Sequence, residues 1–217
     1  MKETVGAVFS IAKENQPVPG CTISKEIHSG QNEIIYFSLA EDTDISAEIY
    51  TYHKLIVMAS GSLTVYGTDG FERTLGANDS ILTPTDTPVG MRTSDGAVYT
   101  EIAIGRNDNM NAAIKAGEAF QLANLVPYQA GKIVNMDILR NDKMKFVIMA
   151  FDAGTGLSEH AAPGEALIFA LDGEGIIVYE GKEHQVKAGD NFHFAKAGLH
   201  SVKATQQFKM ALLLTLG

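Results

Sequence analysis

Short apolar runs separated by turn residues recur along the whole chain. The runs are rich in Val, Ile, Phe and Tyr, as in IIVY at 176–179. Asp69-Gly70 and Glu180-Gly181 lie between such runs and are typical of β-hairpin turns. Strands at intervals of roughly 8–12 residues, with no long helices between them, indicate an all-β sandwich or barrel.

One segment, RNDNMNAAIKAG at 106–117, departs from this pattern. Asp108 can cap the N-terminus of a helix, and an Ala/Ile stretch follows it. Lys115 suits the last turn of a helix, and Gly117 suits the position after its end. We therefore predict a short helix near 108–116.

The pattern of runs occurs twice. Three segments of the first half have counterparts in the second half at a separation of 111 or 112 residues. The matching pairs are GAVFSIA (6–12) with GEAFQLA (117–123), YFSLAEDTDISAE (36–48) with IMAFDAGTGLSEH (148–160), and NDSILTPTDTPV (78–89) with GDNFHFAKAGLH (189–200). Offsets this steady indicate a duplicated domain. We expect a first domain at 1–105, a helical linker at 106–117 and a second domain at 118–217.

Composition narrows the class of protein. The chain has 217 residues, of which 45% are hydrophobic, enough for one large domain or two of about 100 residues. Its formal net charge is −9 and it has no run of basic residues, which argues against nucleic-acid binding. The apolar runs are too short to cross a bilayer, and Lys13 and Glu14 interrupt any secretory leader. Because the single cysteine, Cys21, fits a reducing compartment, we expect a cytoplasmic protein without a membrane partner.

With the repeat placed, the second half resembles the cupin superfamily, and the whole chain resembles a two-barrel member, a bicupin. The family carries two motifs, G-x5-H-x-H-x3–4-E-x6-G and G-x5-P-x-G-x2-H-x3-N. The first falls on Gly154, His160, Ala162, Ala166 and Gly173, and the second falls on Gly189, Ala195, Ala197, His200 and Ala204. The resemblance implies two tandem jelly-roll β-barrels joined by the short helix, with a compact bicupin or a homodimer as the assembly.

The resemblance also implies a metal site in the C-terminal barrel, on His160 and His200. Imidazole and carboxylate ligands in such a barrel can hold one divalent transition metal, Zn, Fe, Mn, Ni or Cu. A third ligand would have to come from Glu165, Glu159 or His193. Strand side chains alternate between faces, so Glu165, one residue from the usual glutamate position, should point away unless a loop re-aims it. In the alternative, the two histidines are polar residues at the barrel mouth, bonded to backbone or water.

The first half departs further from the family pattern. Its residues at the ligand positions are Glu48, Tyr50, Lys54 and Val89, so we expect no metal there. Lys54 could supply the positive charge of a metal and pair with Glu48, since a buried ion pair is tolerated only when both partners are satisfied. In the alternative, both side chains lie in water at the rim.

These observations favour a binding protein whose C-terminal barrel holds a small organic ligand and whose N-terminal barrel is structural. Glu159, His193, Glu48 and Lys54 are the candidate ligand contacts besides the metal positions. The competing hypothesis is a metal-dependent cupin oxygenase, isomerase or lyase acting on a small molecule. Two missing ligands weigh against it, because so few anchors hold a metal poorly. A third possibility is that the chain acts through its surface.

Overall fold

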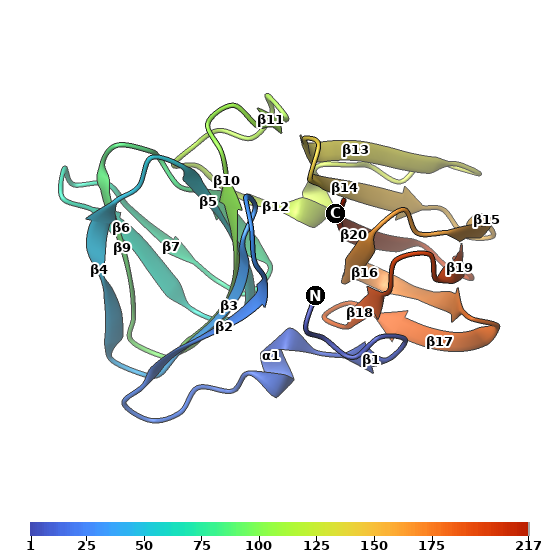
Figure 1. Ribbon diagram of the computed structural model, residues 1–217, viewed down its shortest axis with the longest axis horizontal. Helices are drawn as coiled ribbons and strands as arrows, with labels where there is room; N and C mark the ends of the chain where they lie inside the picture. Colours follow the sequence, from blue (N-terminus) through green and yellow to red (C-terminus); the bar gives the residue numbers. More distant parts are fainter. Residues whose placement is uncertain (217) are drawn as a thin grey trace.

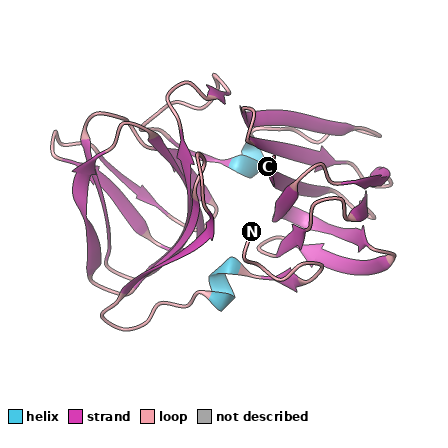
Figure 2. Ribbon diagram, in the orientation of Figure 1, coloured by secondary structure: helices cyan, strands magenta, loops and turns pink. Residues whose placement is uncertain are grey.

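Strands account for most of the structure, as the alternating pattern predicts. The computed structural model describes residues 1–216, and Figure 1 shows two groups of strands side by side, one from each half of the chain. The described helical elements are α1 (Ile11–Glu14) and the single 3-10 turn η1 (Leu122–Asn124), coloured cyan in Figure 2. Within residues 1–216, no helix has the length and apolar character needed to span a bilayer. The all-β fold class is therefore confirmed.

The first group of strands forms two sheets. Its strands are β2 (Thr22–His28), β3 (Ile34–Leu39), β4 (Thr43–Ile49), β5 (His53–Gly61), β6 (Leu63–Gly67), β7 (Glu72–Leu75), β8 (Asp79–Leu82), β9 (Pro88–Thr93) and β10 (Ala97–Ile104). Strands β2, β3, β10, β5 and β8 follow one another in one sheet, and β4, β9, β6 and β7 in the other. All these neighbours are antiparallel.

The second group repeats this order of pairing. Its strands are β13 (Ile133–Arg140), β14 (Met144–Phe151), β15 (Gly156–Ala161), β16 (Glu165–Tyr179), β17 (Lys182–Lys187), β18 (Asn191–Phe194), β19 (Leu199–Lys203) and β20 (Phe208–Thr215). Strands β13, β14, β20, β16 and β18 follow one another, and β15 pairs with β19. The second part of the long β16 pairs with β17 and β19. The two halves thus have the same topology, which supports a duplication.

The segment that opens each half adds a short strand to the other half. Strand β1 (Val8–Phe9) pairs with β18, and β12 (Ala119–Gln121) pairs with β8. The helical turns that follow bury Ile11 and Leu122, which are 1% and 2% exposed. The sheets therefore do not divide at residues 105 and 118, since each half exchanges one strand with the other.

The linker 106–117 is not a helix, which corrects the sequence prediction. It consists of turns and the short strand β11 (Asn109–Met110), which pairs with β13. The side chain of Asp108 accepts a hydrogen bond from the backbone N–H of Gly105, and that of Asn111 accepts one from Ala113. Short polar side chains that bond nearby backbone in this way compete with helical hydrogen bonds.

Apolar side chains form one core inside each group and a third core between the groups. On β16, Ala166 and Ile168 face the interior of the second group, whereas Leu167 and Phe169 join the core between the groups. This alternation follows from the two-residue period of a strand. The same alternation determines which polar side chains on these strands lie on the same side of the sheet.

Candidate functional site

His160 and His200 lie opposite each other on neighbouring strands. They are paired in the register of β15 and β19, and their ring centroids are 4.2 Å apart with planes inclined at 53°. His200 is only 6% exposed and stacks on Phe194, with ring centroids 4.2 Å apart, whereas His160 is exposed at the rim. The two motif positions that keep a histidine are thus brought together at the mouth of the second group.

Both rings are held in the same tautomer by backbone carbonyls. The Nδ1 atom of His160 lies 2.8 Å from the carbonyl oxygen of Ser158, and that of His200 lies 3.1 Å from the carbonyl oxygen of Gly198. A carbonyl only accepts hydrogen bonds, so each Nδ1 carries a proton, and Nε2 of the neutral ring presents a lone pair. Within residues 1–216, neither Nε2 atom has a hydrogen-bond partner.

Burial favours the neutral form of His200. It lowers the pKa of the imidazole below its usual value of 6.5, and the neighbouring His160 lowers it further. The hydrogen bond to the carbonyl of Gly198 opposes this shift but does not cancel it. His200 therefore offers an uncharged hydrogen-bond acceptor at neutral pH.

Apolar side chains fill the interior behind the two histidines. Ala162 and Ala166, at the positions of the second histidine and the glutamate of the motif, are 4% and 1% exposed. The aromatic side chains of this core are Phe151, Tyr179, Phe192, Phe194 and Phe208. The space that ligating side chains would occupy is thus lined by methyl groups and aromatic rings.

The donors present do not fit the metal centre of the family pattern. His160 and His200 supply two of the four positions, and alanines stand at the other two. Within residues 1–216, no group of three or more His, Cys, Asp or Glu side chains is placed to hold a metal ion. Two imidazoles without a third protein donor make a weak site for a transition metal.

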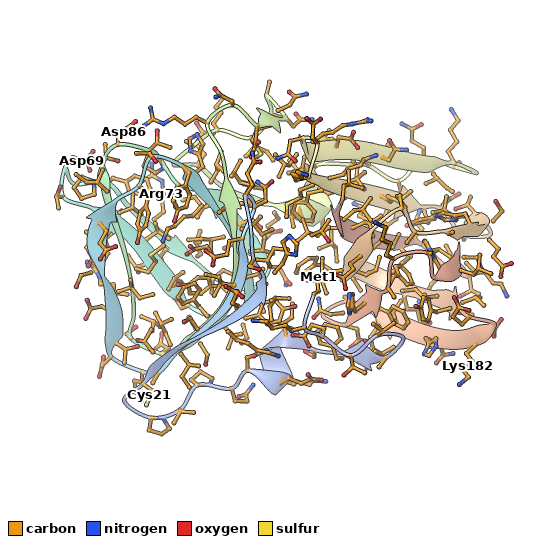
Figure 3. All side chains as sticks on the ribbon, viewed as in Figure 1. Met1, Cys21, Asp69, Arg73, Asp86 and Lys182 are labelled. Carbon is orange, nitrogen blue, oxygen red and sulfur yellow. The ribbon has the colours of Figure 1, made fainter. Side chains whose placement is uncertain are left out.

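Glu165 and His193 lie together, but away from the histidine pair. The Nδ1 atom of His193 is 2.9 Å from the carbonyl oxygen of Glu3, and its Nε2 is 3.7 Å from Glu165 Oε1. The amino group of Met1, labelled between the two groups in Figure 3, bonds the same carboxylate. The expectation that Glu165 or His193 could complete the ligand set is corrected, because strand alternation turns both side chains toward the space between the groups. Glu159 is exposed on β15.

Lys54 forms an ion pair inside the first group, with a partner that the sequence did not suggest. Its Nζ lies 3.2 Å from Glu101 Oε1, and both side chains are more than nine-tenths buried. The same Nζ lies 3.8 Å from the centroid of the Tyr50 ring, whose hydroxyl donates to Glu48 Oε2 over 2.8 Å. The predicted Lys54–Glu48 pair is therefore corrected: Tyr50 stands between them, and Glu101 holds the opposite charge.

Two polar atoms beside this pair have no partner within residues 1–216. They are Glu101 Oε2 and the hydroxyl of Tyr99, both buried. Burial raises the pKa of the Glu101 carboxyl above its usual value, an effect that the charge of Lys54 partly opposes. Alternation along β10 could have revealed Glu101, because it shares a face with the buried Tyr99.

The second half of the chain matches a family model. The family model for the cupin domain matches residues 147–216, which contain both histidines of the pair. This part of the chain is therefore a cupin domain. No curated protein sequence matches the chain.

Solved structures extend the likeness to nearly the whole chain. The Cupin 2 conserved barrel domain protein from Leptotrichia buccalis is 27% identical, with a TM-score of 0.86 over 99% of this chain and 98% of that one. Salicylate 1,2-dioxygenase from Pseudoaminobacter salicylatoxidans, in its adducts with gentisate, is 11% identical, with a TM-score of 0.65 over 96% and 80%. Protein Ylba from E. coli is 12% identical, with a TM-score of 0.62 over 99% and 94%. The likeness to the last two concerns the cupin-like jelly-roll fold alone.

Proposed function

We propose that the chain is a bicupin that binds a small organic molecule at His160 and His200, while its N-terminal barrel is structural. The observation that carries this proposal is the pair of unpartnered Nε2 atoms on two neighbouring rings. Neutral imidazole Nε2 atoms accept hydrogen bonds, so the ligand carries hydroxyl or N–H donors.

The first barrel supports a structural role. Its interior charges, Lys54 and Glu101, neutralise each other, and Tyr50 covers the ammonium group. The second barrel differs because His160, which carries one of its unpaired acceptors, is exposed, whereas the unpaired Glu101 Oε2 and Tyr99 hydroxyl of the first are buried. Binding through those acceptors needs no resident metal, in keeping with the donor set.

Ligand-dependent thermal stabilisation tests the proposal. A panel of small polyols, hydroxy acids and amines is screened against the wild-type protein, and the hits are titrated calorimetrically. We expect affinity to fall by about ten-fold or more in both His160→Ala and His200→Ala, because each variant removes one hydrogen-bond acceptor. The matched control is His28→Ala on β2, in the other half, which should bind like the wild type.

Two results would contradict the proposal. One is a panel without any stabilising compound. The other is a hit whose affinity is the same in wild type and both histidine variants, since such a compound would bind elsewhere.

A further inference from the structure

A cavity of about 320 Å³ lies between the two halves, apart from both barrel interiors. Strands β5 and β10 of the first half and β16 and β20 of the second contribute to its walls, and the turns α1 and η1 border it. Its volume falls at the lower end of the range for ligand cavities, which run from about 300 to 1,000 Å³.

The apolar part of this wall comes in matched pairs from the two repeats. Val57 on β5 lies across from Thr100, and Phe169 on β16 lies across from Ala211. Ile11 and Leu122 stand at matching places in the two opening segments. The duplication alone thus accounts for an apolar cavity between similar surfaces.

The polar part of the wall breaks this symmetry. Both sheets have a register shift at the same place. Lys209, which pairs with Asp172 in the second half, therefore corresponds to Val98, which pairs with Ser60 in the first half. The second repeat therefore places a cation on the wall where the first repeat has an apolar side chain. Asn191 also lines the cavity, but it already bonds the backbone of Ile11 and Ile168.

Lys209 is a buried cation without a carboxylate partner. It is 9% exposed, and its Nζ donates to the carbonyl of Ala123 over 2.7 Å and lies 4.4 Å from the centroid of the Tyr128 ring. Within residues 1–216, no carboxylate oxygen lies within 4.0 Å of it. Buried charges are normally paired, because desolvation of a lone charge is costly. The ammonium group of Lys209 is therefore available for direct contact with a bound anion.

A second group on the wall also lacks a partner. Thr100 is 1% exposed, and its Oγ1 has no hydrogen-bond partner within residues 1–216. Two acids, Asp172 and Asp190, also line the cavity. Asp172 is exposed and its carboxylate accepts the Tyr128 hydroxyl over 2.8 Å, whereas the carboxylate of Asp190 accepts the backbone N–H of Lys187 over 3.0 Å. Water screens the exposed carboxylate of Asp172, which weakens its attraction for the buried ammonium group of Lys209.

We propose that this cavity binds a small organic acid with an apolar body, independently of the histidine pair. Its carboxylate would accept hydrogen bonds from Lys209 Nζ and Thr100 Oγ1, since both residues line the cavity. Its body would lie against Val57, Phe169 and Leu122. The acid places a carboxylate in direct contact with Lys209 and covers the apolar wall contributed by both repeats.

Calorimetric titration with benzoate and hexanoate, each beside its neutral amide, tests this site. We expect at least one acid to bind and its amide to bind at least about ten-fold more weakly, since a hydrogen bond to a charged group is the stronger kind. Lys209→Met should weaken binding of the acid by a similar factor. Lys182→Met is the matched control, because this exposed lysine lies at the outer edge of the second group (Figure 3), and it should leave the affinity unchanged.

Thr100→Val keeps the test decisive if Lys209→Met fails to fold. It removes a buried hydroxyl without a partner, so the unliganded variant should melt at a higher temperature than the wild type. The same variant should bind the acid more weakly, a combination that a purely structural role would not produce. His200→Ala should bind the acid like the wild type, which separates this site from the histidine pair.

The proposal is overturned if neither acid binds. It is also overturned if amide and acid bind equally, or if Lys209→Met and Thr100→Val both bind the acid like the wild type.

Discussion

Replacing Lys54 by methionine should turn a satisfied ion pair into an isolated buried charge. The side chains of Lys54 and Glu101 are 7% and 8% exposed, so solvent cannot replace the lost partner. Removal of one member of a buried pair typically costs about 3–5 kcal/mol, because the remaining charge stays desolvated. We therefore expect Lys54→Met to lower the free energy of unfolding by about that amount at pH 8.

The cost should depend on pH, because Glu101 can escape it by taking up a proton. The pKa of Glu101 is already raised by burial in the wild type, and loss of the opposing Lys54 raises it further. At pH values between the unfolded pKa of Glu101, near 4.5, and its raised native pKa, the folded chain binds more protons than the unfolded chain. This contribution to stability therefore falls as the pH rises through that window. Below about pH 4.5 Glu101 is neutral in both states, so the penalty of Lys54→Met should largely disappear.

Urea unfolding at pH 8, 6 and 4.5 measures this difference, with the wild type and variant compared at each pH. Lys203→Met is the matched control, since it breaks an ion pair with Glu183 in which both side chains are more than half exposed. Such a surface pair is worth at most about 1 kcal/mol. The double variant Lys54→Met/Glu101→Leu should recover most of the lost stability at pH 8. A loss that is equal at all three pH values, and that the double variant does not recover, would refute this reasoning.

Three further predictions concern the second half. Because burial lowers the pKa of His200, wild-type stability should fall as the pH drops below about 6.5, and melting curves of His200→Phe should lack that part of the decline. Elemental analysis by plasma mass spectrometry should find transition metal well below one ion per chain, and stoichiometric metal that is lost in both His160→Ala and His200→Ala would contradict the donor-set argument. Glu165→Gln should leave ligand affinity at the histidine pair unchanged while lowering stability by at most about 1 kcal/mol in urea unfolding, since Glu165 contacts Met1 and His193 instead.

Local sequence patterns predicted the strands well but not the exchange between the halves. Runs of alternating or continuous apolar residues identify strands because a half-buried sheet imposes a period of two. Strands β1 and β12 have two and three residues, too few to show a period, and their partners lie in the other half. The predicted helix at 106–117 failed because Asp108 and Asn111 bond neighbouring backbone in turns.

The candidate site was predictable where it depended on fixed spacing and unpredictable where it depended on distant pairing. Motif spacing identified His160 and His200, and alternation correctly warned that Glu165 would face away from them. The partner of Lys54 lies on β10, and the sequence of neither strand alone determines the register of β5 against β10. The sequence therefore suggested a carboxylate partner for Lys54 as one of two alternatives, and alternation marked Glu101 as an inward residue, but neither pattern showed that the two residues meet.

The two repeats differ most in how they handle polar groups in buried positions. The first half pairs Lys54 with Glu101 inside its own strands and leaves no charge in excess there. The second half has the neighbouring His160 and His200 and a cation without a carboxylate in contact, Lys209, on the surface it shares with the first half. A buried cation without a carboxylate in direct contact is costly to desolvate, and a ligand that binds only the folded chain stabilises it. We therefore expect the proposed acid to stabilise the junction of the two halves, because it would contact both of them.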